Sequence, residues 1–318
     1  MVEIPPEKSR GAEKKPDAND RVTTPAAEAA RDPEGWLVGR LLITTTAFLR
    51  DKGSASPRLD AELLLSRVLK MPKIQLYVNF ERPLTQRELD EYRELVRRRS
   101  HHEPVAYILG QREFYGLTLK TTPAALIPRP ETEHLVDEAL RLARELWPDQ
   151  PLALADLGCG TGAIALALTK NLPLAEISMV DISPSALELA RENAEALGLG
   201  QRLNFEVGDL LSPLTGRRFH LICANLPYIP SPEMSGLMPD VGLHEPHLAL
   251  DGGPKGLTPI ARLLKDAPDH LEAGGRLILE IWPDSLRELE TLAGNLGYQV
   301  DEPIRDLAGF NRIVVLHR

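Results

Sequence analysis

The sequence predicts an α/β protein in which a mostly parallel, doubly wound sheet carries helices on both faces. Ahead of this sheet it predicts a small all-helical domain and a β-hairpin connector. Short apolar runs alternate with helical patterns from residue 134 onward, as they do where a helix joins two parallel strands. Before residue 109, by contrast, apolar residues recur at helical spacing alone.

The polar N-terminal segment, residues 1–33, is predicted to be a disordered tail. It is rich in Lys, Glu, Asp, Pro and Ala and has almost no large apolar side chains, so folding it would cost more conformational entropy than burial returns. Residues 34–108 are predicted to form the helical domain. Its clearest helix covers Leu59 to Val68, where apolar residues share one face behind the start signal Ser56-Pro57.

Residues 109–133 are predicted to form the β-hairpin and a proline-rich connector. Alternating residues such as Phe114 and Leu117 are typical of a hairpin, and the prolines of Pro128-Arg129-Pro130 stiffen the chain behind it. Residues 134–318 then form the α/β domain, in which strands and helices alternate. Its last predicted members are the strand Leu277 to Ile281, the helix Leu286 to Leu296 and the strand Arg312 to Leu316.

Composition and charge restrict the possible functions. The formal net charge of −9 argues against tight sequence-independent binding to nucleic acid, which depends on clustered Lys and Arg. No apolar run reaches the roughly 18 residues of a membrane span, and the N-terminus lacks the apolar core of a signal peptide. The two cysteines, Cys159 and Cys223, have no metal-ligand spacing. We therefore expect a cytoplasmic protein with no metal, no membrane contact and no direct contact with nucleic acid.

A glycine loop between the first predicted strand and its helix predicts a nucleotide-type cofactor site. Glycines let the backbone approach a ligand, and amide groups at the helix start donate hydrogen bonds to it. Asp181 ends the next strand about 20 residues later, where a carboxylate can accept both hydroxyls of a ribose. Ser183 caps the helix that follows, which leaves Asp181 free for that role. The loop candidates are Gly158, Cys159, Gly160, Thr161 and Gly162.

The third strand of the α/β domain leads to Asp209 and Leu210. Asp209 can accept a hydrogen bond from an adenine amino group, and Leu210 can cover the ring. On the glycine loop alone a nicotinamide dehydrogenase remains an alternative, because Gly158, Gly160 and Ala163 satisfy the dinucleotide fingerprint. That alternative does not explain a second motif, which lies about 65 residues further along the chain.

The second motif is Asn225-Leu226-Pro227-Tyr228, at the carboxyl end of a predicted buried strand. An amide or exocyclic amine nitrogen is a weak nucleophile because its lone pair is delocalised, so an enzyme that alkylates it must fix its two N–H bonds. The Asn225 side-chain oxygen can accept one, and the Leu226 carbonyl the other, because Pro227 holds Leu226 extended. Tyr228 can stack on the flat group. Alone the tetrapeptide would be read as a turn, but beside the glycine loop it predicts a methyl-donor site facing an amide or amine.

Several further motifs accompany these two. They are Ser56-Pro57-Arg58-Leu59-Asp60-Ala61-Glu62, Gly110-Gln111-Arg112-Glu113-Phe114 and Ile127-Pro128-Arg129-Pro130-Glu131-Thr132-Glu133. In this combination residues 36–318 resemble the release-factor glutamine methyltransferases of the PrmC/HemK family. The resemblance implies a Rossmann-like class I methyltransferase fold, S-adenosylmethionine as the cofactor, and methylation of the side-chain nitrogen N5 of the Gln in the Gly-Gly-Gln motif of peptide chain release factors. It makes residues 34–108 a substrate-recognition domain and residues 134–318 the methyltransferase domain.

The resemblance carries functional roles onto the matching residues. It implies cofactor contacts for Gly158 to Gly162, Asp181, Asp209, Leu210 and Asn225, catalytic and substrate contacts for Asn225, Leu226, Pro227 and Tyr228, and substrate contacts for Arg129 and Glu131. Two positions depart from the family pattern. The family usually has Pro where Leu226 stands, and Phe where His244 precedes Glu245-Pro246. Leu226 keeps the carbonyl acceptor but loses the rigidity of one proline.

Other substrates remain open, because Asn-Leu-Pro-Tyr also occurs in RNA adenine dimethyltransferases. The alternatives are an RNA or DNA amino-methyltransferase, a ribosomal-protein glutamine methyltransferase and a non-catalytic adapter that binds the methyl donor. The connector motif and the position of the helical domain ahead of the α/β domain favour release factors as protein substrates. We expect the enzyme to act as a monomer.

Overall fold

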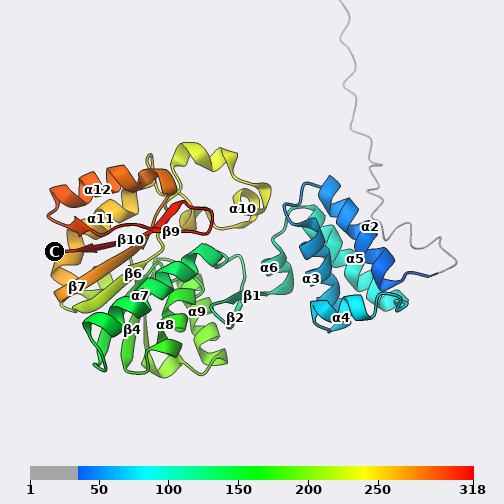
Figure 1. Cartoon of the computed structure of the whole chain (residues 1–318), viewed down its shortest axis with the longest axis horizontal. Helices are drawn as coiled ribbons and strands as arrows, with labels where there is room; N and C mark the ends of the chain where they lie inside the picture. The colour runs from blue at the N-terminus through cyan, green and yellow to red at the C-terminus, as the bar shows by residue number, and fades with distance from the viewer. Residues whose placement is uncertain (1–34) are drawn as a thin grey trace, which may run out of the picture. The chain divides into compact units, whose positions relative to one another are not determined.

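The structure of the protein, a computed structural model, describes residues 35–318. It forms two compact units, one ending at Arg97 and the other spanning Arg98–Arg318 (Figure 1). The predicted tail, residues 1–33, lies outside the described residues. The units are therefore described one at a time, beginning with the N-terminal one.

The N-terminal unit is built from helices in its described residues. These are α2 (Val38–Asp51), α3 (Pro57–Leu69), α4 (Lys73–Val78) and most of α5 (Gln86–Ser100). A capping box starts α5, because the Thr85 N–H donates to Glu88 at 2.8 Å while the Thr85 hydroxyl accepts from the Glu88 N–H at 3.3 Å. The hydroxyl of buried Tyr92 donates to the Ala61 carbonyl at 3.1 Å, which ties α5 to α3. The predicted helical domain is confirmed.

The second unit begins with a connector region that includes the predicted hairpin. Its elements are α6 (Val105–Leu109), β1 (Gln111–Phe114), β2 (Leu117–Lys120), the 3-10 turn η1 (Pro130–Thr132) and α7 (Glu133–Leu146). The strands pair antiparallel, with Phe114 opposite Leu117. Between them Tyr115 and Gly116 have φ of +49° and +66°, as a tight two-residue hairpin loop requires.

The core of the second unit is a sheet of eight strands, within the described residues. They are β3 (Leu152–Leu157), β4 (Ala175–Asp181), β5 (Leu203–Val207), β6 (Phe219–Ala224), β7 (Leu271–Glu280), β8 (Gln299–Val300), β9 (Ile304–Arg305) and β10 (Asn311–His317). Their order is β5-β4-β3-β6-β7-β10-β8, with β9 also pairing to β10. Strands β3 to β7 are parallel, and β10 is antiparallel to its neighbours. The chain thus reverses its strand order next to β3, where doubly wound sheets bind ligands.

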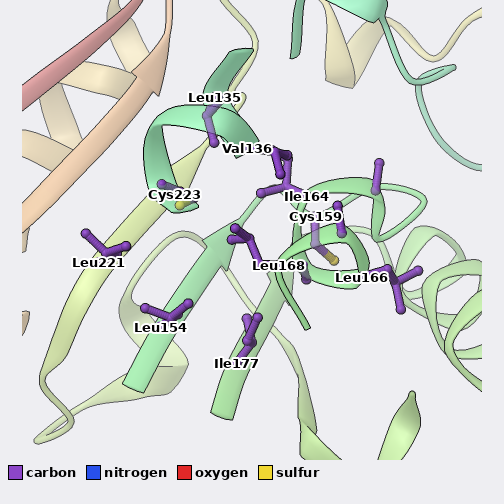
Figure 2. Close-up of a cluster of buried hydrophobic side chains, with 14 of the residues drawn as sticks. Leu135, Val136, Leu154, Cys159, Ile164, Leu166, Leu168, Ile177, Leu221 and Cys223 are labelled. Atoms are coloured by element: carbon purple, nitrogen blue, oxygen red, sulfur yellow. The ribbon is translucent and has the colours of Figure 1, made fainter. Parts of the chain in front are cut away.

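Helices cover both faces of this sheet, as the sequence predicts. Besides α7 they are α8 (Ala163–Asn171), α9 (Pro184–Ala196), α11 (Thr258–Asp266) and α12 (Leu286–Asn295). The short helix α10 (Pro239–His244) has no buried residues and belongs to neither face. On one face Leu154 and Ile177 pack against α7, α8 and α9 in a cluster that includes Leu135 and Leu166 (Figure 2). Alternate strand residues, such as Ala155 and Leu157 on β3, join a second cluster with α11 and α12. None of the helices in residues 35–318 is long and apolar enough to cross a membrane.

One predicted boundary is wrong by several residues. Strand β7 begins at Leu271 rather than at Leu277. The missed part is Glu272-Ala273-Gly274-Gly275-Arg276, whose polar residues and glycines are typical of a turn. In the structure Gly274 has a φ of +77°, and the pairing of β6 with β7 is irregular near Phe219, so the added segment is a bent start to the strand.

Candidate active site

A cavity of about 280 Å³ opens at the carboxyl ends of the parallel strands. Its walls come from the segments that follow β3, β4, β5 and β6, from residues 124–132 of the connector and from residues 246–262. All of these belong to the second unit. Most of the predicted site residues therefore meet around one cavity, although they are spread over about 100 residues of sequence.

The glycine loop forms the floor of the cavity at the end of β3. The N–H groups of Gly158 and Cys159 donate to the Val180 carbonyl at 2.8 and 3.0 Å, which fixes the loop against β4. Gly158 has a φ of +71°, and a Cβ there would lie 3.2 Å from the Leu226 side chain. Gly160 and Thr161 also line the cavity. Glycine is thus required at Gly158 by both its backbone conformation and its neighbour.

Gly162, although predicted to bind the cofactor, is not among the described residues that line the cavity. Its φ is +82°, and a Cβ there would meet Met179 at 2.9 Å and Ala190 at 3.3 Å. The glycine therefore allows the start of α8 to pack closely against β4 and α9. This is the helix–strand packing role that the third glycine of such loops performs.

Asp181, at the end of β4, is fixed by backbone donors on both carboxylate oxygens. Oδ2 accepts from the Gly160 N–H at 2.9 Å and Oδ1 from the Ser183 N–H at 2.9 Å. Burial raises the pKa of this carboxyl group, while the two N–H groups oppose that shift. Each oxygen keeps a second lone pair, and the carboxylate lines the cavity. The Ser183 hydroxyl accepts from the Ala186 N–H at 3.2 Å and caps α9.

The far wall of the cavity combines apolar and charged side chains. Leu210 lines it with a φ of +52°, and Asp209 lines it while pairing with Arg262, another wall residue. The sequence analysis missed Ile182, which lines the same cavity although it is 52% exposed. The sequence signal for Ile182 as a cavity residue was its position directly after Asp181, the predicted ribose carboxylate. An apolar slot beside a fixed carboxylate suits a flat ring joined to a ribose, so the residues present fit S-adenosylmethionine.

Asn225 lies at the edge of the cavity with its side-chain amide fixed in one orientation. Its Nδ2 donates to Glu280 Oε2 at 2.9 Å and to the Thr132 hydroxyl at 3.1 Å. Both N–H bonds of the amide are therefore used, and the acceptor Oδ1 is left to bind a ligand. The neighbouring residues Leu226 and Pro227 also line the cavity, and Leu226 is buried over the glycine loop.

Tyr228 does not belong to the cavity wall formed by the described residues. Its hydroxyl donates to Glu280 Oε1 at 2.9 Å, and its ring lies 6.3 Å from that of Trp282, measured between centroids, with a tilt of 41°. Burial, together with the Glu280 carboxylate, raises the pKa of this hydroxyl, which is therefore protonated and acts as a donor. The tyrosine thus joins the end of the tetrapeptide to Glu280 and Trp282 at the end of β7.

The two connector residues expected to bind substrate lie in different places. Arg129 lines the cavity and pairs with buried Glu245 at 2.6 Å, and the second oxygen of Glu245 accepts from the Ile127 N–H at 3.2 Å. Glu131 is not one of the described wall residues. His244, which departs from the family pattern, has its Nε2 3.1 Å from the His101 carbonyl oxygen.

Glu280 and Thr132 are the functional candidates that sequence reasoning missed. Glu280 is the last residue of β7 and is 1% exposed, and Thr132 ends η1 and is 4% exposed. The sequence held two signals: a carboxylate inside the apolar strand pattern Leu277 to Ile281, and Thr132 within the connector motif. Neither signal predicts that Thr132 and Glu280 bind each other, because the two residues are 148 residues apart.

The glycine loop, the ribose-type carboxylate and the fixed asparagine amide on a doubly wound sheet define a methyltransferase. Comparison with known proteins agrees, since residues 133–235 match the family described as methyltransferase small domain. Residues 40–110 match the family described as PrmC N-terminal domain.

Whole-length relatives identify the group more narrowly. The chain is 43% identical to a release factor glutamine methyltransferase from Rhodopirellula baltica, over 92% of this chain and 99% of that relative. A protein of the same description from Geobacter sulfurreducens is 41% identical, over 89% of this chain and 97% of that one. A solved release factor-specific protein-(glutamine-N5) methyltransferase from Alicyclobacillus acidocaldarius is 25% identical, with a TM-score of 0.38 over 62% of this chain and 98% of that chain. On the sequence relatives, the chain belongs to the release factor glutamine methyltransferase family.

Proposed function

We propose that this protein transfers the methyl group of S-adenosylmethionine to the side-chain nitrogen N5 of the Gln in the Gly-Gly-Gln motif of peptide chain release factors. The observation that carries the proposal is the fixed Asn225 amide at the cavity edge, in a chain 43% identical to a release factor glutamine methyltransferase. A fixed acceptor beside a methyl-donor cavity is what an amide nucleophile requires.

The cofactor would be held by the glycine loop and the carboxylates around the cavity. Asp181 would accept the ribose hydroxyls, and Asp209 with Leu210 would contact the adenine. The residues expected to contact the cofactor are Gly158, Cys159, Gly160, Thr161, Asp181, Asp209, Leu210 and Asn225, whereas Gly162 would support the loop by packing. When bound, S-adenosylmethionine supplies an electrophilic methyl group on its sulfonium.

The chain's own part in the reaction is to orient the substrate amide. Asn225 Oδ1 and the Leu226 carbonyl would accept the two N–H bonds of the glutamine side chain, while Pro227 keeps that carbonyl in place. Tyr228, which the sequence placed on the amide plane, would instead support the tetrapeptide through its hydrogen bond to Glu280. Arg129 and Glu131 would contact the chain around the glutamine. The nitrogen lone pair then forms the N–CH3 bond as the S–CH3 bond breaks, and one amide proton leaves to solvent.

We further propose that the enzyme works as a cytoplasmic monomer. Cys159 and Cys223 are both buried free thiols, which suits a reducing compartment. The formal charge of −9 favours a protein substrate over sequence-independent contact with nucleic acid.

The direct test is methyl transfer from labelled S-adenosylmethionine to a purified release factor. The matched control is the same factor with the Gln of its Gly-Gly-Gln loop changed to Ala. Label on the native loop alone supports the proposal. Equal label on both factors would place the methyl group elsewhere, and no label on either, with label on added RNA, would assign the enzyme to the nucleic-acid methyltransferases instead.

A further inference from the structure

Glu280 collects three hydrogen bonds from two separate parts of the chain. Its Oε2 accepts from Asn225 Nδ2 at 2.9 Å and from the Thr132 hydroxyl at 2.6 Å, and its Oε1 accepts from the Tyr228 hydroxyl at 2.9 Å. The carboxylate is 1% exposed, so solvent offers it no further donors. The connector and the tetrapeptide therefore meet at one buried charge at the end of β7.

The chemistry of the three donors favours the ionised carboxylate. A carboxylate only accepts hydrogen bonds, and each of its partners here carries a proton to give. Burial raises the pKa of Glu280, whereas the Thr132 and Tyr228 hydroxyls and the charge of Arg312 act to lower it. Glu131 raises it through charge repulsion. Burial dominates, so the pKa of Glu280 stays above its ordinary value, and the hydrogen bonds reduce but do not remove the cost of the buried anion.

An asparagine amide needs such a partner to have a defined orientation. Its oxygen and its NH2 group have nearly the same shape, so packing alone does not decide which of them faces the cavity. An ionised carboxylate does decide, because it attracts Nδ2 and repels Oδ1. The Thr132 hydroxyl adds to this: it donates to Glu280, so its lone pairs are left to accept the second N–H of Asn225.

We propose that Glu280 is a positioning residue, which holds the Asn225 amide so that Oδ1 faces the substrate amide and also holds Tyr228 behind it. The proposal rests on the proposed function, because the orientation matters only where Asn225 must accept an N–H bond. Glu280 itself touches neither the substrate nor the cofactor cavity, and it acts through Asn225. An inverted Asn225 would present its N–H groups to the N–H groups of the substrate. The substrate nitrogen would then no longer be oriented towards the methyl group.

The test replaces Glu280 by a residue of the same shape. In Glu280→Gln one carboxylate oxygen becomes an NH2 group. The Asn225 amide can then turn its oxygen towards this new group and present its own NH2 group to the cavity. We expect kcat for release factor methylation to fall about 100-fold, because the nucleophile is no longer oriented. The dissociation constant for S-adenosylmethionine should stay unchanged. The matched control is Glu288→Gln, an exposed glutamate on α12 that pairs with Lys255, and its kcat should equal that of the wild type.

A double-mutant cycle separates positioning from general damage. If Glu280 acts through Asn225, Glu280→Gln should lower kcat much less in an Asn225→Ala background than in the wild type. Equal losses in both backgrounds, or an unchanged kcat in the single variant, would overturn the proposal. If Glu280→Gln lowers the melting temperature severely, Thr132→Val takes its place. This isosteric change removes one acceptor from Asn225 and should lower kcat in the same direction with the fold intact.

A readout that needs no substrate separates this proposal from the proposed function. In NMR spectra of protein labelled with 15N-asparagine, the side-chain NH2 protons of Asn225 should exchange slowly with solvent in the wild type. Their chemical shifts should change strongly in Glu280→Gln. Unchanged signals would refute the positioning role even if release factor is methylated. Shifted signals with no methylation of release factor by the wild type would leave the positioning intact and refute the substrate assignment.

Discussion

Asp156, the residue before the last of β3, is a fully buried carboxyl group ahead of the glycine loop. Its Oδ2 accepts from the Ala165 N–H at 3.1 Å, whereas Oδ1 has no hydrogen-bond partner among the described residues. Burial is the main cause that raises its pKa to about 7, and the charge of Asp181 adds to the shift. The protonated form suits the folded state, since it carries no buried charge.

This pKa predicts how stability changes with pH. The folded-state value of about 7 lies above the ordinary value of about 3.9 for an unfolded chain. The contribution of Asp156 to stability is therefore fully present below about pH 4 and is lost as the pH rises through about 7. Asp156→Asn should remove this decline from the free energy of unfolding, measured by urea titration between pH 4 and pH 8. The same pH slope in both proteins would contradict the assignment.

Asn225 is the residue on which the chemistry depends most. In Asn225→Ala we expect kcat for methyl transfer to fall by a factor of about 100 to 1,000, the size typical when one fixed hydrogen-bond partner of a reacting group is removed. Binding of S-adenosylmethionine, measured by calorimetry, should largely persist, because the glycine loop and Asp181 are untouched. Asn295→Ala, on the exposed end of α12, is the control. Full turnover by Asn225→Ala would indicate a different nucleophile-binding group.

At the scale of secondary-structure elements, two buried carboxylates bind the connector to the rest of the α/β domain. Glu280 receives the Thr132 hydroxyl, and Glu245 receives both the Arg129 side chain and the Ile127 N–H. The connector thus reaches the cavity as part of the folded domain. This gives a physical reason for part of the motif from Ile127 to Thr132, because the Arg129 side chain, the Thr132 side chain and the Ile127 N–H each bind a carboxylate that is distant in sequence.

The Arg129–Glu245 ion pair predicts a stability effect at the scale of these elements. Arg129→Ala leaves Glu245, whose side chain is only 1% exposed, as a buried charge without its cation. We expect a loss of about 3 kcal/mol in the free energy of unfolding, as is typical when one partner of a buried pair is removed. The double change Arg129→Ala with Glu245→Gln should recover part of that loss. Equal stability of the wild type and Arg129→Ala would show that the pair contributes nothing.

Local patterns were sufficient to predict much of the fold and part of the site. The alternation around Phe114 predicts the hairpin, and the apolar run before Gly158 predicts β3, because each depends on neighbours in the sequence. The early start of β7 and the partners of Glu280 were not predictable in this way. Gly274 and Gly275 resemble a turn and lie in an irregular stretch of the strand, which β6 pairs with on either side, at Leu271 and at Arg276. Glu280 meets Thr132 and Asn225 only through the tertiary fold.

For the whole molecule, net charge predicts the class of partner. With a formal charge of −9, the protein should not bind the negatively charged phosphates of RNA. Adding single-stranded RNA to the methyl-transfer assay at low salt should therefore leave the rate on release factor unchanged. A rate that RNA lowers at low salt, and that recovers at high salt, would reveal a basic surface and would support the nucleic-acid alternative.

The central claim is that the methyl group is attached to one nitrogen, N5 of the Gly-Gly-Gln glutamine. The most direct test is tandem mass spectrometry of a release factor that has been incubated with the enzyme and S-adenosylmethionine. The account predicts one added methyl group per release factor, on the side-chain nitrogen of that glutamine, and none with the Asn225→Ala enzyme. A methyl group on any other residue, or the same product from the Asn225→Ala enzyme, would contradict it.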